Sequence, residues 1–376
     1  MYADVADVPA YHALGLTYPD ICTPNWLRSN PALFLGFWGR CFNDYRDATP
    51  HEGYALISGW RNSEFTHTDA AEAVRSRAGG GHAFFCFTSN VDAHWARYCA
   101  PSELRECHGN AETWQCADTA CSSGGRERHA FAVDAQTLKI VRVEEPTGPD
   151  AEERRWLAPA GYRFHVDEDS RLAADGDPAV AASSPRPMRA AGEPMADGEP
   201  PHDDTMAADA FASNHPRCVR CGGPARPSIL MFGDSGWVDD GAQASHWERW
   251  REAVVQAAED DASLRVVVLE AGAGGNVPTV RRVSEEMVER VVDVGATATL
   301  IRVNPDLPLA DDHKNAMHTI PLRTTGLVAV RAIDERLSRI RASSACSLAD
   351  AEVPLIASLL VPPSEDRATE DDSDSI

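Results

Sequence analysis

Short apolar runs alternate with amphipathic segments through the second half of the chain. The runs at 229–232, 264–269 and 299–303 are continuous, which is typical of strands that are covered on both faces of a parallel sheet. Between them, residues 243–259 and 278–293 carry apolar side chains at helical spacing. This alternation predicts β-α-β units and therefore an α/β fold.

The first part of the chain, residues 1–75, is predicted to be mostly helical. Aromatic and apolar side chains recur from Trp26 to Tyr45 at steps of three and four, as on a helix with one buried face. Asn30-Pro31 predicts a helix start, with Asn as the cap and Pro in the first turn. After a glycine turn, the apolar run at 83–88 predicts a strand.

Two segments lack a folding pattern. Residues from about 167 to 215 are rich in Ala, Asp, Pro, Gly and Ser and carry almost no periodic apolar side chains, which predicts a disordered insertion. The end of the chain, 346–376, is acidic, and we expect a disordered tail there. The sequence shows no internal repeat.

Composition narrows the range of partners and compartments. The chain has 376 residues, 43% of them apolar, and a net charge of −23, so it should repel nucleic acids rather than bind them. No apolar stretch approaches the roughly 20 residues of a membrane helix, and the first residues do not resemble a secretory signal. Ten cysteines without such a signal indicate a reducing compartment, so we expect a cytoplasmic or nuclear protein.

Four of the cysteines have the spacing of a zinc site. Cys116-x4-Cys121 and Cys218-x2-Cys221 match zinc-ribbon half-sites, in which each pair lies on a tight turn and four thiolates surround Zn²⁺. The alternative is four unrelated buried cysteines. The remaining ones are most simply core or surface thiols: Cys22, Cys41, Cys86, Cys99, Cys107 and Cys346.

Two polar segments follow the predicted strand at 83–88. Thr88-Ser89-Asn90-Val91-Asp92 lies where open α/β sheets place ligand-binding residues, although a plain Asx turn would fit it equally well. His108 is followed by a glycine and could approach a sugar as a general base near neutral pH. Taken alone, His108 is better explained as a structural histidine.

Three later segments offer weaker candidates. Gly272 and Gly274 follow a strand and open a helix, where backbone amides can approach a pyrophosphate, but the full G-x-G-x-x-G spacing is missing. Asn304 follows the next strand and is placed to contact an adenosine or merely to cap a turn. Phe232-Gly233-Asp234 could form an edge for an extended peptide or a simple strand exit.

Taken together and in this order, these motifs resemble the sirtuin (SIR2) family of NAD-dependent protein deacylases. The similarity covers about 25–120 and 215–340. The chain departs from the family pattern at Ser89, at Asp234 and at Ala273-Gly274. The matching positions are Thr88, Asn90, Asp92, His108, Gly109, the four cysteines, Phe232, Gly233, Gly272 and Asn304.

The resemblance implies a Rossmann-like parallel sheet with helices on both faces, together with a small zinc-ribbon module that carries the disordered insertion. The expected parts are a helical segment (1–75), Rossmann-like parts (76–115 and 226–345), the zinc module (116–225) and the tail (346–376). NAD would lie across the sheet, and an acylated-lysine protein or peptide would bind between the sheet and the zinc module.

By the same resemblance, the acyl group passes from lysine to ADP-ribose and nicotinamide is released. His108 would act as the base for a ribose hydroxyl, Asn90 would order the ribose and a water, and Asp92 would hold the nicotinamide carboxamide. Further cofactor contacts would come from Thr88, Ser89, Gly272, Gly274 and Asn304. The acyl group, the protein substrate and the oligomeric state stay open.

One part of the family pattern is missing. Residues 1–30 contain neither its opening strand and Gly-Ala-Gly loop nor its Asp-Phe-Arg segment, so we expect a truncated chain rather than a relic that binds NAD poorly. Two alternative functions follow. One is a catalytically silent zinc-ribbon/Rossmann interaction module. The other is NAD hydrolysis or ADP-ribosyl transfer, which His108 and Asn90 could also serve.

Overall fold

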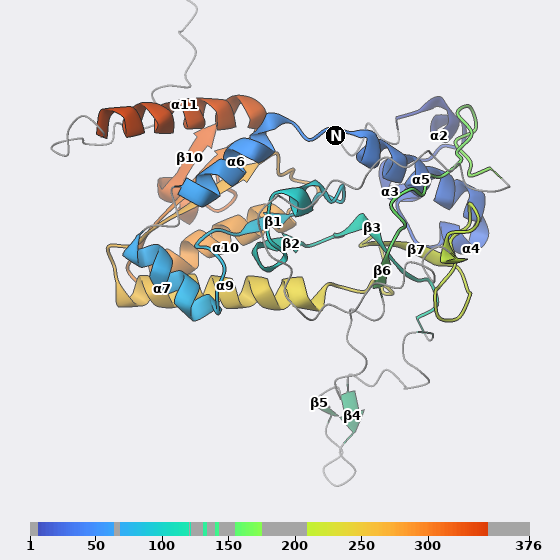
Figure 1. Cartoon of the computed structure of the whole chain (residues 1–376), viewed down its shortest axis with the longest axis horizontal. Helices are drawn as coiled ribbons and strands as arrows, with labels where there is room; N and C mark the ends of the chain where they lie inside the picture. The colour runs from blue at the N-terminus through green and yellow to red at the C-terminus, as the bar shows by residue number, and fades with distance from the viewer. Residues whose placement is uncertain are drawn as a thin grey trace, which may run out of the picture. The chain divides into compact units, whose positions relative to one another are not determined.

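The computed structural model describes residues 7–63, 68–119, 121, 131–133, 140–142, 155–174 and 209–344 (Figure 1). The chain divides into two compact units, Met1–Val254 and Val255–Ile376. The finer division into five parts stays a prediction, and the expected acidic tail lies outside the described residues. No helix within the described ranges is both long enough and apolar enough to cross a lipid bilayer.

The first unit begins with the predicted helices. α5 begins at Pro31 because Asn30 Oδ1 accepts a hydrogen bond from Leu33 N at 3.1 Å, and proline needs no donor partner in the first turn. The bounds are α2 (Pro9–Ala13), α3 (Tyr18–Ile21), α4 (Trp26–Ser29), α5 (Pro31–Asp47), α6 (Glu52–Ser63) and α7 (Asp69–Ala78).

An aromatic core lies beneath α5. Phe42 of this helix packs edge to face on Phe164, with ring centroids 5.6 Å apart. Phe164 in turn stacks on the fully buried Trp114, and Phe211 completes the cluster against Trp114 at 5.2 Å. Residues that are far apart in the sequence therefore share one core, and burial of these rings is a major source of its stability.

The disordered insertion predicted over 167–215 is wrong at both of its ends. Residues 167–174 approach α5 so closely that a Cβ at Gly36 would lie 2.1 Å from Arg171 O. At the other end, Asn214 is fully buried, and its side-chain amide donates to His165 O at 2.7 Å and to Ala174 O at 2.9 Å. Hydrogen bonds and a close approach of the backbone hold these two ends in place. Contacts of this kind produce no periodic pattern of apolar residues in the sequence. Residues 175–208 lie outside the described ranges.

Two kinds of strand pairing occur in the first unit. β1 (Cys86–Thr88) and β2 (Leu104–Glu106) are parallel. β3 (Gly109–Cys116) lies between β6 (Arg155–Leu157) and β7 (Ala225–Ile229) and is antiparallel to both. β4 (Phe131–Val133) and β5 (Ile140–Arg142) form a separate antiparallel pair.

The strand predicted at 229–232 is therefore displaced and belongs to a different kind of sheet. It ends at Ile229, and the following Leu230 and Phe232 are 37% and 42% exposed. Arg226 of β7 is buried because Asp234 pairs with both of its terminal nitrogens, at 2.5 and 3.0 Å. Because the charged Arg226 lies within the strand, the apolar run begins only after it. The sequence therefore predicted a strand that lies too far towards the following loop.

Short helical elements connect the parallel pair to the rest of the unit. η1 (His94–Arg97) and η2 (Pro101–Glu103) lie between β1 and β2. α9 (Gly241–Asp260) follows β7 and ends in the second unit. Its Trp247 packs against Phe85 and Phe87, which flank the start of β1, at 5.2 and 5.1 Å between ring centroids.

The second unit is the predicted β-α-β region. β8 (Arg265–Ala271), β9 (Thr297–Val303) and β10 (Thr319–Leu322) form a parallel sheet in the order β10-β9-β8. α10 (Thr279–Asp293) and η5 (His313–His318) join them, and α11 (Gly326–Ser344) follows. The sequence prediction of parallel strands alternating with helices is confirmed here.

Helices cover both faces of this sheet. On one face, Ile301 and Val303 pack with Ala329 of α11. On the other, Arg302 pairs with Glu285 of α10 at 2.9 Å, since alternate residues of a strand point to opposite sides. This arrangement, together with the four-cysteine module of the first unit, confirms the predicted fold class.

A buried ion-pair network holds the carboxyl ends of these strands. Arg302 is fully buried and pairs with Glu270 of β8 at 2.7 Å and with Glu285 of α10 at 2.9 Å. Glu285 also accepts backbone hydrogen bonds from Asp311 and Asp312. Arg281 continues the network through two bonds to Asp311, at 2.6 and 2.7 Å. The loop that follows β9 is thereby tied to α10.

Replacing Arg302 with methionine should destabilise the second unit by about 3–5 kcal/mol, because two carboxylates would stay buried without their cation. Chemical denaturation followed by circular dichroism would measure the change in the unfolding free energy. Arg339→Met is a matched control, because Arg339 pairs with Glu335 on an exposed face of α11. This substitution should lower the unfolding free energy by less than about 1 kcal/mol. Equal effects in the two variants would contradict the role given to the buried network.

Candidate functional site

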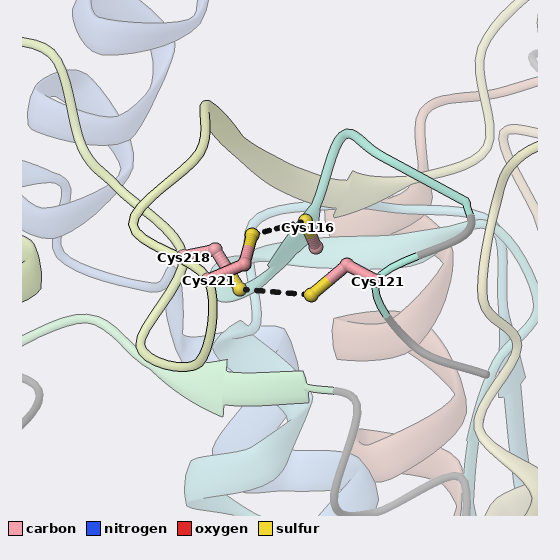
Figure 2. Close-up of side chains that lie close together, drawn as sticks. All are labelled: Cys116, Cys121, Cys218 and Cys221. Atoms are coloured by element: carbon pink, nitrogen blue, oxygen red, sulfur yellow. Dashed lines mark hydrogen bonds between the residues drawn. The ribbon is translucent and has the colours of Figure 1, made fainter. Parts of the chain in front are cut away.

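Four cysteines converge at one end of the antiparallel sheet. Cys116 ends β3, Cys121 follows it, and Cys218 and Cys221 lie on the turn before β7. Figure 2 shows the four sulfurs directed towards one another, with Cys116 Sγ 3.7 Å from Cys221 Sγ and Cys121 Sγ 3.8 Å from Cys218 Sγ. All four sulfurs lie within 4.8 Å of one another. The sequence prediction that these residues come together is confirmed.

The turn between Cys218 and Gly223 directs backbone amides at sulfur. Arg220 N donates to Cys218 Sγ and Gly223 N donates to Cys221 Sγ, each at 3.4 Å. Two backbone bonds close the turn, from Gly222 N to Cys218 O and from Cys218 N to Gly223 O. Amides that donate to sulfur favour its anionic form, the form that binds metal.

The cluster fits a structural zinc ion. A Zn–S bond of about 2.3 Å in a tetrahedron places neighbouring sulfurs about 3.8 Å apart, which agrees with the distances observed. Burial raises the pKa of Cys116, and raises that of Cys121 to about 11, so these thiols would keep their protons at neutral pH without a cation. Four sulfur ligands leave no open position for water, so the ion would serve folding rather than catalysis.

The loop after β1 and the turn after β2 lie side by side in the first unit. Thr88 and Glu106 are register partners at the carboxyl ends of the parallel pair. Cys107 N donates to Thr88 O, and Ala111 N donates to Val91 O, both at 2.9 Å. The loop 89–92 is therefore hydrogen-bonded to the segment that carries His108.

The polar residues of this loop also shape it. Thr88 Oγ1 accepts a bond from Asn90 N at 3.0 Å, and Asp92 Oδ1 accepts one from His94 N at 2.8 Å. The Asn90 side chain bonds Tyr54. Ser89 is half-buried. The turn-capping alternative is therefore present in the structure, and the ribose and carboxamide contacts of Asn90 and Asp92 stay predictions.

His108 lies on the turn between β2 and β3 and is half-buried. Burial, together with the neighbouring Arg105, lowers the pKa of its imidazole, which favours the neutral form that can accept a proton. The next residue, Gly109, has a φ of +70°, and a Cβ there would lie 1.8 Å from Ser228 O. Only glycine fits this position, which fixes the backbone that presents His108.

The sequence prediction missed a buried acid beside this turn. Glu106 is 4% exposed, and its Oε2 accepts bonds from Asn110 Nδ2 at 2.7 Å and from Gln243 Nε2 at 3.2 Å. Burial raises the pKa of Glu106 to about 7. Glu106 ends a strand of three residues, which is too short to show a period, and Gln243 is distant in sequence, so no local pattern identifies it.

The candidates of the second unit lie on two neighbouring loops at the carboxyl ends of its strands. Gly272, directly after β8, has a φ of +73°, and its amide donates to Val303 O. Asn304 Nδ2 donates to Ala273 O at 2.9 Å, and Asn304 Oδ1 accepts from Asp306 N and Leu307 N at the same distance. Asn304 thus caps a turn and clamps the loop that contains Gly274. Its contact with an adenosine stays a prediction.

No protein-family model matches the sequence, and no curated protein matches it. Among solved structures, the chain is similar to a Sir2 homologue mutant in complex with ADP-ribose, with 14% sequence identity and a TM-score of 0.38, over 88% of this chain and 82% of that one. It is also similar to a mutant Sir2 homologue in complex with 2′-O-acetyl ADP-ribose, with 13% identity and a TM-score of 0.40, over 89% of this chain and 84% of that one.

Replacing Cys218 with serine should abolish zinc binding and unfold the antiparallel sheet around β3, because structural zinc contributes directly to folding. Zinc content of the purified chain, measured by inductively coupled plasma mass spectrometry, should fall from one ion per chain to none. Cys41→Ala is the control, since Cys41 is an equally buried thiol outside the cluster. A Cys218 variant that keeps its zinc would disprove the assignment.

Replacing Glu106 with glutamine should change how stability depends on pH. The pKa of Glu106 is about 7 in the folded chain against an ordinary value of 4.5, so its contribution to stability is fully present below about pH 4.5 and lost as pH rises to about 7. The free energy of unfolding of the variant should therefore rise relative to that of the wild type as pH increases, and the difference should reach up to about 3 kcal/mol at pH 8. Chemical denaturation at several pH values measures this, and parallel curves for the two proteins would refute it.

Proposed function

We propose that the chain is an NAD-dependent protein lysine deacylase, which transfers the acyl group to ADP-ribose and releases nicotinamide. The observation that carries the proposal is the hydrogen-bonded placement of the loop 89–92 beside the His108 turn at the carboxyl ends of β1 and β2. Such ends are where open α/β sheets bind nucleotides. Two polar side chains and a neutral imidazole therefore share one edge of the first unit.

The roles follow from the chemistry of each side chain. His108, with its lowered pKa, would accept the proton of a ribose hydroxyl and so promote attack of that hydroxyl on the activated acyl group. Asn90 would bond the ribose and a water. Asp92 would accept a bond from the nicotinamide carboxamide, because its second carboxylate oxygen makes only a long contact, 3.8 Å, with His94 Nδ1.

Within the second unit, the loops after β8 and β9 have the features of a phosphate- and adenosine-binding edge of their own. Gly272 and Gly274 precede α10 closely enough for backbone amides to approach a phosphate. Asn304 holds the two loops together. The acyl-lysine substrate would bind at the exposed Phe232, which contacts Tyr18 at 6.1 Å between ring centroids.

Nicotinamide release from NAD tests the proposal, with and without an acetyl-lysine peptide, quantified by mass spectrometry together with O-acetyl-ADP-ribose. Replacing His108 with alanine should reduce peptide-dependent release at least about a hundredfold, as loss of a general base does, while zinc content is unchanged. His12→Ala is the control, because His12 is an exposed histidine far along the sequence from the loop.

Three results would contradict the proposal in different ways. Release that does not require the peptide would identify an NAD hydrolase or ADP-ribosyl transferase instead. Full turnover in the His108 variant would remove that residue from the mechanism. An absence of release from a folded chain loaded with zinc would favour an interaction module.

A further inference from the structure

Within the part of the chain that the structure describes, the buried carboxyl group of Glu106 has no cation beside it. Its carboxylate is bonded by two neutral amides, those of Asn110 and Gln243, and it has no ion-pair partner among the described residues. Other buried acids of this unit do have one, as in the pair of Asp234 with Arg226 at 2.5 Å. A buried and uncompensated carboxylate is costly, so its presence at a candidate site points to a role.

The surrounding hydrogen bonds require an acceptor at this position. Asn110 Oδ1 accepts from Thr113 N at 2.9 Å, so its NH₂ group is turned towards Glu106. Gln243 Oε1 accepts from Glu106 N at 2.7 Å, which likewise turns its NH₂ group towards the carboxylate. Both amides are locked as donors. They favour the charged form of Glu106 against the cost of burial.

A second carboxylate lies close by. Asp92 follows Val91, whose carbonyl accepts a bond from Ala111 N at 2.9 Å, and Thr88 at the start of the same loop is the register partner of Glu106. The charge of Asp92 acts on Glu106 in this arrangement. Asp240 also faces Glu106, but Arg155 neutralises it at 2.6 Å. Two carboxylates without arginine partners therefore lie near the carboxyl ends of β1 and β2.

We propose that Glu106 and Asp92 together select the cationic, oxidised nicotinamide ring over the neutral, reduced ring. The inference rests on the proposed function, in which Asp92 binds the nicotinamide carboxamide. NAD⁺ and NADH differ little in shape, but only the oxidised ring carries a positive charge. Carboxylates a few ångströms away in a partly desolvated site therefore distinguish the two by charge. Glu106 is a positioning residue here, since it acts on the ring through space, together with Asp92, and does not touch it.

The selection should depend on pH. Burial raises the pKa of Glu106 to about 7, so its charge is present at pH 8 and largely lost at pH 6. The titratable groups that act on Glu106 are Asp92, Asp240 and Cys86. Asp92 in turn lies near Tyr54 and His94, and Asp240 is paired with Arg155. Of its neighbours in sequence, Arg105 is paired with Asp239 at 2.6 Å and His108 is half-buried. The preference for the oxidised ring is expected to weaken as pH falls across this range.

The test is the ratio of the NADH and NAD⁺ dissociation constants, measured by isothermal titration calorimetry on the zinc-loaded full chain near pH 8 and near pH 6. Wild type should prefer NAD⁺ near pH 8. Glu106→Gln keeps an oxygen that accepts bonds from both amides. It should reduce the ratio of the NADH and NAD⁺ dissociation constants roughly tenfold, and the ratio in this variant should be the same at both pH values. Glu106→Asp keeps the charge and should keep most of the preference.

Glu248→Gln is the matched control, because it removes one exposed carboxylate from the same unit and should leave the ratio unchanged. An unaltered ratio in the Glu106→Gln variant would overturn the inference. Equal affinity of wild type for the two nucleotides would also overturn it and would leave the proposed deacylase intact. If wild type bound neither nucleotide, the proposed function would fail, and the inference with it.

Discussion

A polar group that is removed from water must find a partner inside the protein, and this constraint organises both units. Arg302 is fully buried in the second unit, and the carboxylates that surround it come from a strand and a helix. In the first unit, Gln115 and Asn214 are fully buried, and their amides bond backbone groups far away in sequence. Leaving any of these groups unpaired would cost about 1–3 kcal/mol or more. Their bonds therefore determine where the loops lie.

The same constraint explains why the candidate ligand-binding residues also serve structural roles. Asn304 caps a turn with its oxygen and clamps a neighbouring loop with its nitrogen. Asp92 and Thr88 bond backbone amides within their own loop. A side chain that is held in this way loses little further entropy when a ligand binds, which is how rigid sites gain affinity. Turn-capping and ligand-binding interpretations of these residues are thus compatible.

Part of this arrangement could be predicted from the sequence, where the determinant is local. The cysteine spacing predicted that the pairs Cys116/Cys121 and Cys218/Cys221 form one site. Asn30-Pro31 predicted the start of α5, and apolar runs predicted β8 and β9. Other features depend on contacts between distant residues and leave no periodic pattern. The burial of Arg226 within β7 depends on its pairing with Asp234, and the ordered ends of the predicted insertion depend on the approach to Gly36. The surroundings of Glu106 likewise depend on Gln243, far along the chain.

The parallel pair that carries the proposed catalytic loop cannot be stable by itself. β1 and β2 have three residues each, whereas an isolated pair of strands is marginal in water even when it is longer. α9 and the residues before it supply what is missing: Asp239 pairs with Arg105, and Trp247 packs on Phe85 and Phe87. Gln243 then bonds both the backbone and the carboxylate of Glu106. The surroundings of Glu106 and the position of the His108 turn therefore depend on the start of one helix, which lies more than a hundred residues further along the chain.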